Sequence, residues 1–166
     1  MEKRIISALV VNKSNVLSKV VRLFSARNFN IHSLAVGPTE DDRISRMTIV
    51  VRGDDRVLDQ VMKQLDSLID VIKVVDLGKE EIVAKEFMIV KIEPCSTEER
   101  ILALLMIDTI KESRVIYNGE VITVEMTARE DKIRKFLESM ERFTIREVVR
   151  SGTIAVSREM IVSNIA

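Results

Sequence analysis

The sequence has very few of the residues on which most enzymes and extracellular scaffolds depend. Its 166 residues include one cysteine, one histidine, one tyrosine and no tryptophan. A single cysteine excludes a disulfide framework within the chain, and one cysteine with one histidine excludes a Cys/His metal cage. Because the sequence also lacks a paired-carboxylate motif, it offers little from which a catalytic site could be built.

Net charge and long apolar runs are also absent. The chain carries 26 basic and 26 acidic residues, so it lacks the basic footprint of a nucleic-acid-binding protein. Only seven largely apolar residues separate Met1–Arg4 from Asn12, and no run approaches the length that crosses a membrane. With 46% hydrophobic residues the chain can bury a real core. We therefore expect a cytoplasmic protein that binds neither nucleic acid nor membrane.

The few glycines and prolines fall between segments of regular hydrophobic periodicity, so they mark the ends of elements. The first half of the chain has the order β-α-β-β-α-β. The predicted elements are a strand over residues 3–11, a helix capped by Ser14, strands over Asn30–Val36 and Ile44–Val51, a helix opening at Gly53–Asp55 and a strand over Val71–Leu77.

The second half repeats this order of elements with little similarity in sequence. Capping boxes are predicted at Ser96–Glu99 and Thr127–Glu130, and Asn118-Gly119 predicts a two-residue hairpin turn. The predicted elements are strands over Glu86–Glu93, Arg114–Tyr117, Glu120–Met126 and Ile145–Val149, helices over 97–111 and after Glu130, and a tail over Ser151–Ala166.

These patterns predict an α+β protein of two tandem ferredoxin-like β-α-β-β-α-β units, over residues 1–78 and 79–166. The first and third strands are apolar on both faces, as Ile5-Ile6 and Ile49-Val50-Val51 show. Helices cover only one face of such a sheet. We therefore expect the other face to be buried by oligomerisation or by a partner.

The turn Asn12-Lys13-Ser14-Asn15 is the strongest candidate for a functional site. It joins an apolar strand to a helix, so free backbone N–H groups and the helix dipole favour an anion there. The Asn12 amide adds a donor and an acceptor, a combination that suits an amino acid. Ordinary helix capping explains the same residues, and from the residues alone it is the favoured interpretation.

Other polar residues have plainer interpretations. Asn30 fits a turn position as well as a ligand position. His32 lies in a predicted strand without metal-ligating neighbours, and Cys95 lies in a loop without a nearby base. The cluster Glu40–Asp42 lacks the spacing of a calcium loop, so we expect a solvated turn. Helix 97–111 is apolar on most sides, which fits either a buried helix or one that faces a partner.

Several stretches of the chain together form a specific pattern. The densest are Ser14–Val20, Leu23–Ser25, Phe29–Glu40 and Ser45–Ile49, and the pattern continues into Lys91-Ile92 and Arg150-Ser151-Gly152. In these stretches the chain resembles the small regulatory subunits of acetolactate synthase, also called acetohydroxyacid synthase. The N-terminal part of that family is an ACT domain, a ferredoxin-like module that senses amino acids.

The resemblance implies a non-catalytic subunit without cofactors of its own. It would bind and activate a catalytic large subunit that uses thiamine diphosphate, FAD and magnesium. It would also confer feedback inhibition by valine or another branched-chain amino acid, bound between the ACT domains of a homodimer. The family's two site asparagines match Asn12 and Asn30, which come from opposite chains. The expected effector-binding residues are Asn12, Ser14, Asn15, Val16, Leu17, Asn30 and Ile31.

Two positions depart from the family pattern. Asn15 stands where small subunits usually have a glycine, which lets the backbone approach the ligand closely. Asparagine adds a side chain that can contribute a hydrogen bond or crowd the pocket. His32 replaces what is often an acidic residue. A free-standing amino-acid sensor that acts on another protein is the alternative function, and an enzyme is a third reading.

Overall fold

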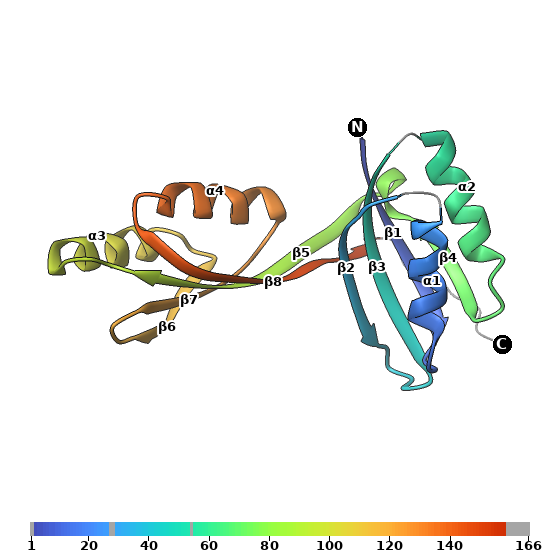
Figure 1. The fold of residues 1–166 in the computed structure, drawn as a ribbon, viewed down its shortest axis with the longest axis horizontal. Coiled ribbons are helices and arrows are strands. Elements are labelled where there is room, and N and C mark those ends of the chain that lie inside the picture. The colour runs from blue at the N-terminus through green and yellow to red at the C-terminus, as the bar shows by residue number, and fades with distance from the viewer. Residues whose placement is uncertain (1, 27–28, 54, 159–166) are drawn as a thin grey trace. The chain divides into compact units, whose positions relative to one another are not determined.

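The computed structural model describes residues 2–26, 29–53 and 55–158. The chain forms two compact units, each drawn in Figure 1. The first contains the described residues of Met1–Ala84 and of Thr153–Ala166, and the second is Lys85–Gly152. This division differs from the expected boundary at residues 78 and 79 in two ways: it falls after Ala84, and the chain returns to the first unit from Thr153 onward.

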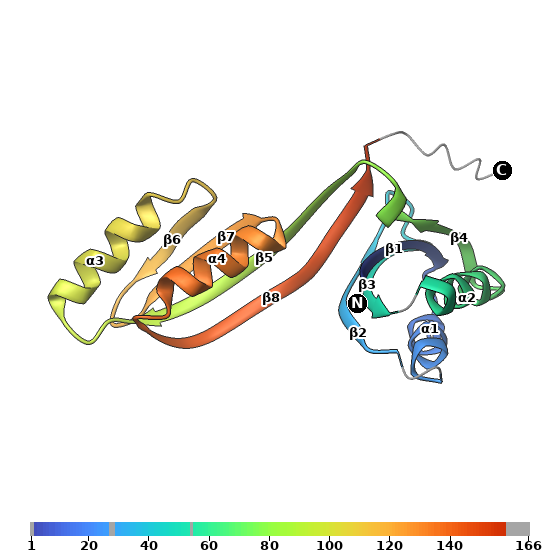
Figure 2. The same ribbon diagram turned by 90° about the horizontal axis from the view of Figure 1, so that it is seen from above.

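The first unit has the expected element order and a four-stranded antiparallel sheet in the order β2-β3-β1-β4. The helices α1 and α2 lie on the same face of this sheet (Figures 1 and 2). The elements are β1 (Glu2–Val11), α1 (Val16–Ser25), β2 (Ile31–Pro38), β3 (Ile44–Gly53), α2 (Asp55–Asp66) and β4 (Val71–Asp76), followed by the short 3₁₀ helix η1 (Leu77–Lys79).

Periodic apolar side chains attach these helices to the sheet. In α1, Val16, Val20 and Phe24 recur at helical spacing and are all buried. They pack with alternate residues of β1 and β3, such as Ile6 and Ile49, which are partners in the register. The core therefore lies between the helices and one sheet face. The first residue of α1, Val16, is already part of this core.

The second unit repeats the architecture, with the sheet order β6-β7-β5-β8. The strand β5 crosses from the first unit into the second, and β8 crosses back. The prediction of two tandem ferredoxin-like units is thereby confirmed. The elements are β5 (Ile82–Glu93), α3 (Thr97–Asp108), β6 (Ser113–Asn118), β7 (Ile122–Ala128), α4 (Glu130–Met140) and β8 (Thr144–Ser157).

Local signals in the second unit were only partly correct. The Ser96 cap is confirmed, since its hydroxyl accepts a bond from the Glu99 N–H. Thr127 caps nothing, because it lies in β7 and α4 begins after Arg129 without a side-chain cap. The turn at Asn118-Gly119 has three residues rather than two, since Asn118 pairs with Ile122.

The face of the first sheet that lies opposite its helices is covered in part by the chain's own end. Thr48 alternates along β3 with the core residues of the helix face, so it points to the opposite face. There its Oγ1 accepts from the Ala155 N–H (3.5 Å), and Ser33 Oγ accepts from the Thr153 N–H (2.9 Å). Part of the cover on this face therefore comes from the chain itself, and its burial by oligomerisation or by a partner stays a prediction.

Candidate functional site

The turn between β1 and α1 has an unusual backbone at Asn15. This residue has φ 70°, in the left-handed region, and it is the only non-glycine residue with positive φ in the described part of the chain. Asn15 is also the N-cap residue of α1, although its side chain makes no capping hydrogen bond. The expected Ser14 cap is therefore wrong by one residue. A left-handed position explains why glycine or asparagine suits it.

The start of α1 presents several unsatisfied donors. The first helical bond runs from the Lys19 N–H to the Asn15 carbonyl, and the Val16 N–H reaches Lys13 O only at 3.4 Å. No acidic side chain lies in the first turn. Partial positive charge therefore collects at this end of the helix. Within the described residues, no acceptor is recorded for the N–H groups of Ser14, Asn15, Leu17 and Ser18.

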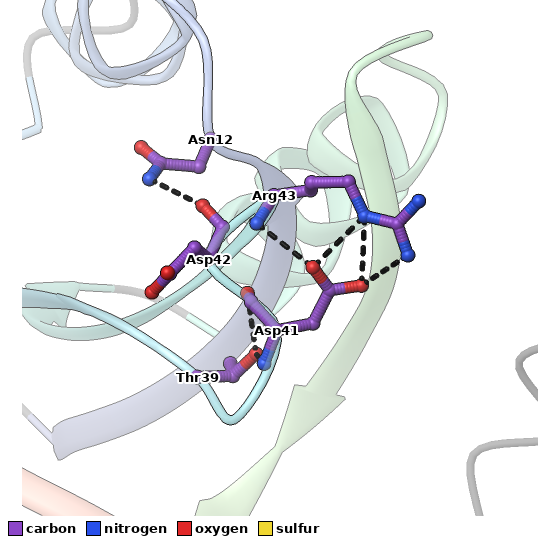
Figure 3. Close-up of polar contacts among 5 residues, drawn as sticks. All are labelled: Asn12, Thr39, Asp41, Asp42 and Arg43. Atoms are coloured by element: carbon purple, nitrogen blue, oxygen red, sulfur yellow. Dashed lines mark hydrogen bonds and ion pairs between the residues drawn. The ribbon is translucent and has the colours of Figure 1, made fainter.

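Asn12 is fixed at the other side of the turn by the loop between β2 and β3. Its backbone N–H donates to Arg43 O at 2.7 Å, and its side-chain Nδ2 donates to Asp42 O at 2.8 Å. Figure 3 shows the carboxamide oxygen directed away from this loop. The Asn12 side chain is exposed, so this oxygen is accessible to a ligand.

The β2–β3 loop is itself held by internal hydrogen bonds. The Asp41 carboxylate accepts from the backbone N–H of Arg43 (2.9 Å) and from its guanidinium (2.7–3.1 Å). The guanidinium bond and then the backbone bond lower the pKa of Asp41 from 3.8 to about 2. Thr39 Oγ1 accepts from the Asp41 N–H at 3.2 Å (Figure 3). This arrangement supports the turn interpretation of Glu40–Asp42 over a cation site.

The apolar residues expected around an effector differ in exposure. Val16 is 3% exposed and lies in the core, so its side chain is not available to an effector, contrary to our expectation. Leu17 is 43% exposed, because it lies next to the buried stripe of α1. Ile31 is half-buried at the start of β2. Of the three, Leu17 and Ile31 can therefore still contribute apolar contacts.

Asn12 and Asn30 lie at opposite ends of the sheet in one chain. Asn12 follows Val11, which pairs with Ile44, whereas Asn30 precedes Ile31, which pairs with Val51. The stretch of β3 between these two partners spans about 24 Å at the usual rise of a strand. One amino acid cannot touch both asparagines of one chain.

Sequence reasoning missed the residues that hold Asn12. The sequence predicts a solvated turn at Glu40–Asp42 and gives it no part in the site. A local signal was present, since aspartate accepts readily from the N–H two residues later, as Asp41 does from Arg43. The bond from Asn12 to this loop had no such signal, because its partner lies 30 residues away.

The remaining candidates show no catalytic arrangement. Cys95 is an exposed free cysteine, and its backbone N–H serves only to bind the Glu99 carboxylate. Among residues 2–26, 29–53 and 55–158, no group of three potential metal ligands comes together. In the same residues, no helix is both long and apolar enough to cross a membrane.

Comparison with known families matches both units of the chain. The family model described as "AHAS small subunit-like ACT domain" matches residues 6–73. A second model, described as "Small subunit of acetolactate synthase", matches residues 85–159. The boundary between the matched segments agrees with the structural division after Ala84.

Individual relatives match over nearly their whole length. A probable acetolactate synthase small subunit from Methanothermobacter thermautotrophicus is 44% identical, with 95% of this chain and 94% of the relative covered. The acetolactate synthase small subunit of Haemophilus influenzae is 40% identical, with 94% and 96% covered. A crystal structure of the small subunit from Thermotoga maritima superposes with a TM-score of 0.81 at 29% identity, covering 96% of this chain and 99% of that one.

Proposed function

We propose that this chain, which belongs to the family of acetolactate synthase small subunits, activates a catalytic large subunit and makes it sensitive to a branched-chain amino acid. Family membership makes it a regulatory subunit rather than the catalytic one. Valine is the effector that we propose to test first. The thiamine diphosphate, FAD and magnesium of the reaction are proposed to reside on the large subunit, and the complex in the cytoplasm.

The β1–α1 turn is the observation that carries this proposal. The carboxylate of the effector would accept from the free N–H groups at the start of α1, where the helix dipole favours an anion. Asn12 would bind the other polar end. Leu17 of one chain and Ile31 of a second copy would contact the branched side chain, while Ser14 and Asn15 contribute backbone donors. The buried side chain of Val16 would hold the turn against the core of the first unit.

The separation of Asn12 from Asn30 supports a homodimer through the first unit. The strand β2 lies at the edge of its sheet, so it can pair with a second copy of itself. In an antiparallel pair, the Asn30 end of one β2 lies beside the Pro38 end of the other. The latter end leads into the loop that binds Asn12. Antiparallel pairing would therefore bring Asn30 of one chain to Asn12 of its partner.

Regulation requires that the effector bind two states of the complex with different affinity. A coupling of about 1–3 kcal/mol would be typical of an allosteric protein. An effector shared by two chains stiffens the interface between them, and the large subunit would respond to that change. This mechanism needs no catalytic residue in the small subunit.

The test is to reconstitute the enzyme from large subunit and small subunit and to titrate valine, leucine and isoleucine. We expect Asn12→Ala and Asn30→Ala to keep the activation and to lose the inhibition. Asn118→Ala is a matched control, because Asn118 binds Arg100 in the second unit. Inhibition that survives both site substitutions in an intact complex would refute the site. A chain that does not associate with the large subunit would favour the free-standing sensor.

A further inference from the structure

Asn12 makes two hydrogen bonds to the β2–β3 loop that neither a helix cap nor an anion site requires. Two successive carbonyl groups of the β2–β3 loop, those of Asp42 and Arg43, accept from the side chain and the backbone of this one residue. Both bonds are short, at 2.8 and 2.7 Å. The loop thus fixes the position of Asn12 and the rotation of its carboxamide.

The chemistry of the carboxamide determines which of its ends is free. A backbone carbonyl can only accept a hydrogen bond, so the group facing Asp42 O must be the NH₂ of Asn12. Its carbonyl oxygen, Oδ1, then points outward as an acceptor, as Figure 3 shows. An outward acceptor favours a cationic ammonium group and disfavours a carboxylate.

The loop that supplies these carbonyls depends on Asp41. This carboxylate binds both the backbone and the guanidinium of Arg43, and the Asp41 carbonyl accepts from the Ile44 N–H at 2.8 Å. Thr39 Oγ1 accepts from the Asp41 N–H. The adjacent Asp42 contributes only its backbone oxygen to this network. Asp41 and Asp42 therefore have the same charge and different roles.

We infer that Asp41 is a positioning residue for effector recognition: it holds the β2–β3 loop so that Asn12 presents Oδ1 to the ammonium group of an amino acid. The inference rests on the proposed function and deepens it, because it assigns the two ends of the effector. The ammonium group lies against Asn12, and the carboxylate lies at the start of α1. The β2–β3 loop, which lies outside the β1–α1 turn, then partly determines how well the site distinguishes an amino acid from its amine-free analogue.

The test measures binding to the full chain by calorimetry, with L-valine and with 3-methylbutanoate, which keeps the carboxylate and the branched side chain but has no donor in place of the ammonium. We expect Asp41→Ala to weaken valine binding by about three- to ten-fold, the value of one ordinary hydrogen bond. Binding of the amine-free acid should change little. Asp42→Ala removes the same charge from the same loop and should leave both ligands unaffected.

An equal loss for both ligands in Asp41→Ala would overturn the inference, because a merely structural role would not distinguish them. An unchanged preference for valine would overturn it as well. If Asp41→Ala does not fold, Arg43→Ala removes the same ion pair from the other side and is judged by the same ratio. A wild-type chain that binds neither valine, leucine nor isoleucine, alone or with its large subunit, would refute the proposed function itself.

Discussion

Asn15→Gly separates the backbone role of Asn15 from any role of its side chain. A left-handed backbone costs an ordinary residue about 1–2 kcal/mol, and asparagine less. Glycine removes this strain, but it costs about 0.5–1 kcal/mol of conformational entropy on folding. The Asn15 side chain makes no capping bond whose loss would add to the change. We therefore expect Asn15→Gly to alter the free energy of unfolding by less than about 0.5 kcal/mol.

Two neighbouring substitutions serve as comparisons. Asn15→Ala keeps a Cβ in the left-handed region and should destabilise the chain by about 1 kcal/mol. Ser14→Ala should be nearly neutral, since Ser14 is exposed and does not cap α1. The measurement is urea denaturation followed by circular dichroism. A loss of about 1 kcal/mol or more in Ser14→Ala would indicate a true serine cap and would refute this assignment of the helix start.

Asn15→Gly also tests whether the turn senses the effector. Glycine at position 15 opens the space that the asparagine side chain occupies, so valine affinity should change even though stability does not. Calorimetric titration of the full chain measures this directly. An affinity equal to that of the wild type would show that the Asn15 side chain neither contacts nor crowds the effector, and would limit the role of this residue to its backbone N–H.

Two further predictions concern ion pairs. Arg150→Ala should destabilise the chain by about 3 kcal/mol, because it leaves the Glu86 carboxylate, which is 4% exposed, without the guanidinium that binds both of its oxygens. Arg134→Ala loses only an ion pair with the exposed Glu138, so it should cost less than about 0.5 kcal/mol in the same denaturation assay. The pKa of Asp41 is lowered on folding, so its contribution is complete above about pH 4 and is lost as the pH falls through about 2. The ionisation of Asp41 should therefore not change the valine affinity between about pH 5 and 8. A decline of the affinity centred in this pH range, seen in the wild type and equally in Asp42→Ala, would contradict the ion pair.

Periodicity in the sequence was sufficient to predict the fold because helix and strand repeats are local. The stripe of Val16, Val20 and Phe24 is an example, and so is the Ser96 cap, whose partner is three residues away. The end of β8 could not be predicted in this way. The prediction of a strand over Ile145–Val149 and a tail from Ser151 was wrong, because β8 continues to Ser157. Within it Gly152 adopts φ 77°, and Ser151 Oγ accepts from the Phe87 N–H. That contact joins residues 64 positions apart.

The candidate site shows the same limit. The turn from Asn12 to Asn15 was visible as a polar interruption between a strand and a helix. Its most informative contact, from Asn12 to the Asp42 carbonyl, depends on the β1–β3 register that brings the two loops together. Sequence patterns identify polar residues, but they do not reveal which side of a carboxamide is already satisfied. The direction of the Asn12 oxygen is therefore knowledge that only the structure supplies.

Under the proposed function, the end of β8 offers a route by which effector binding in the first unit would act on the second. Ser33 lies two residues beyond Ile31 on β2, and its hydroxyl accepts from the Thr153 N–H. From Thr153 the chain continues backward along β8 directly into the second unit. A movement of β2 that accompanies effector binding would thus act on a strand that both units share. Coupling by this route requires only that the Ser33–Thr153 bond differ between the two states, because an element that is identical in both cannot transmit free energy.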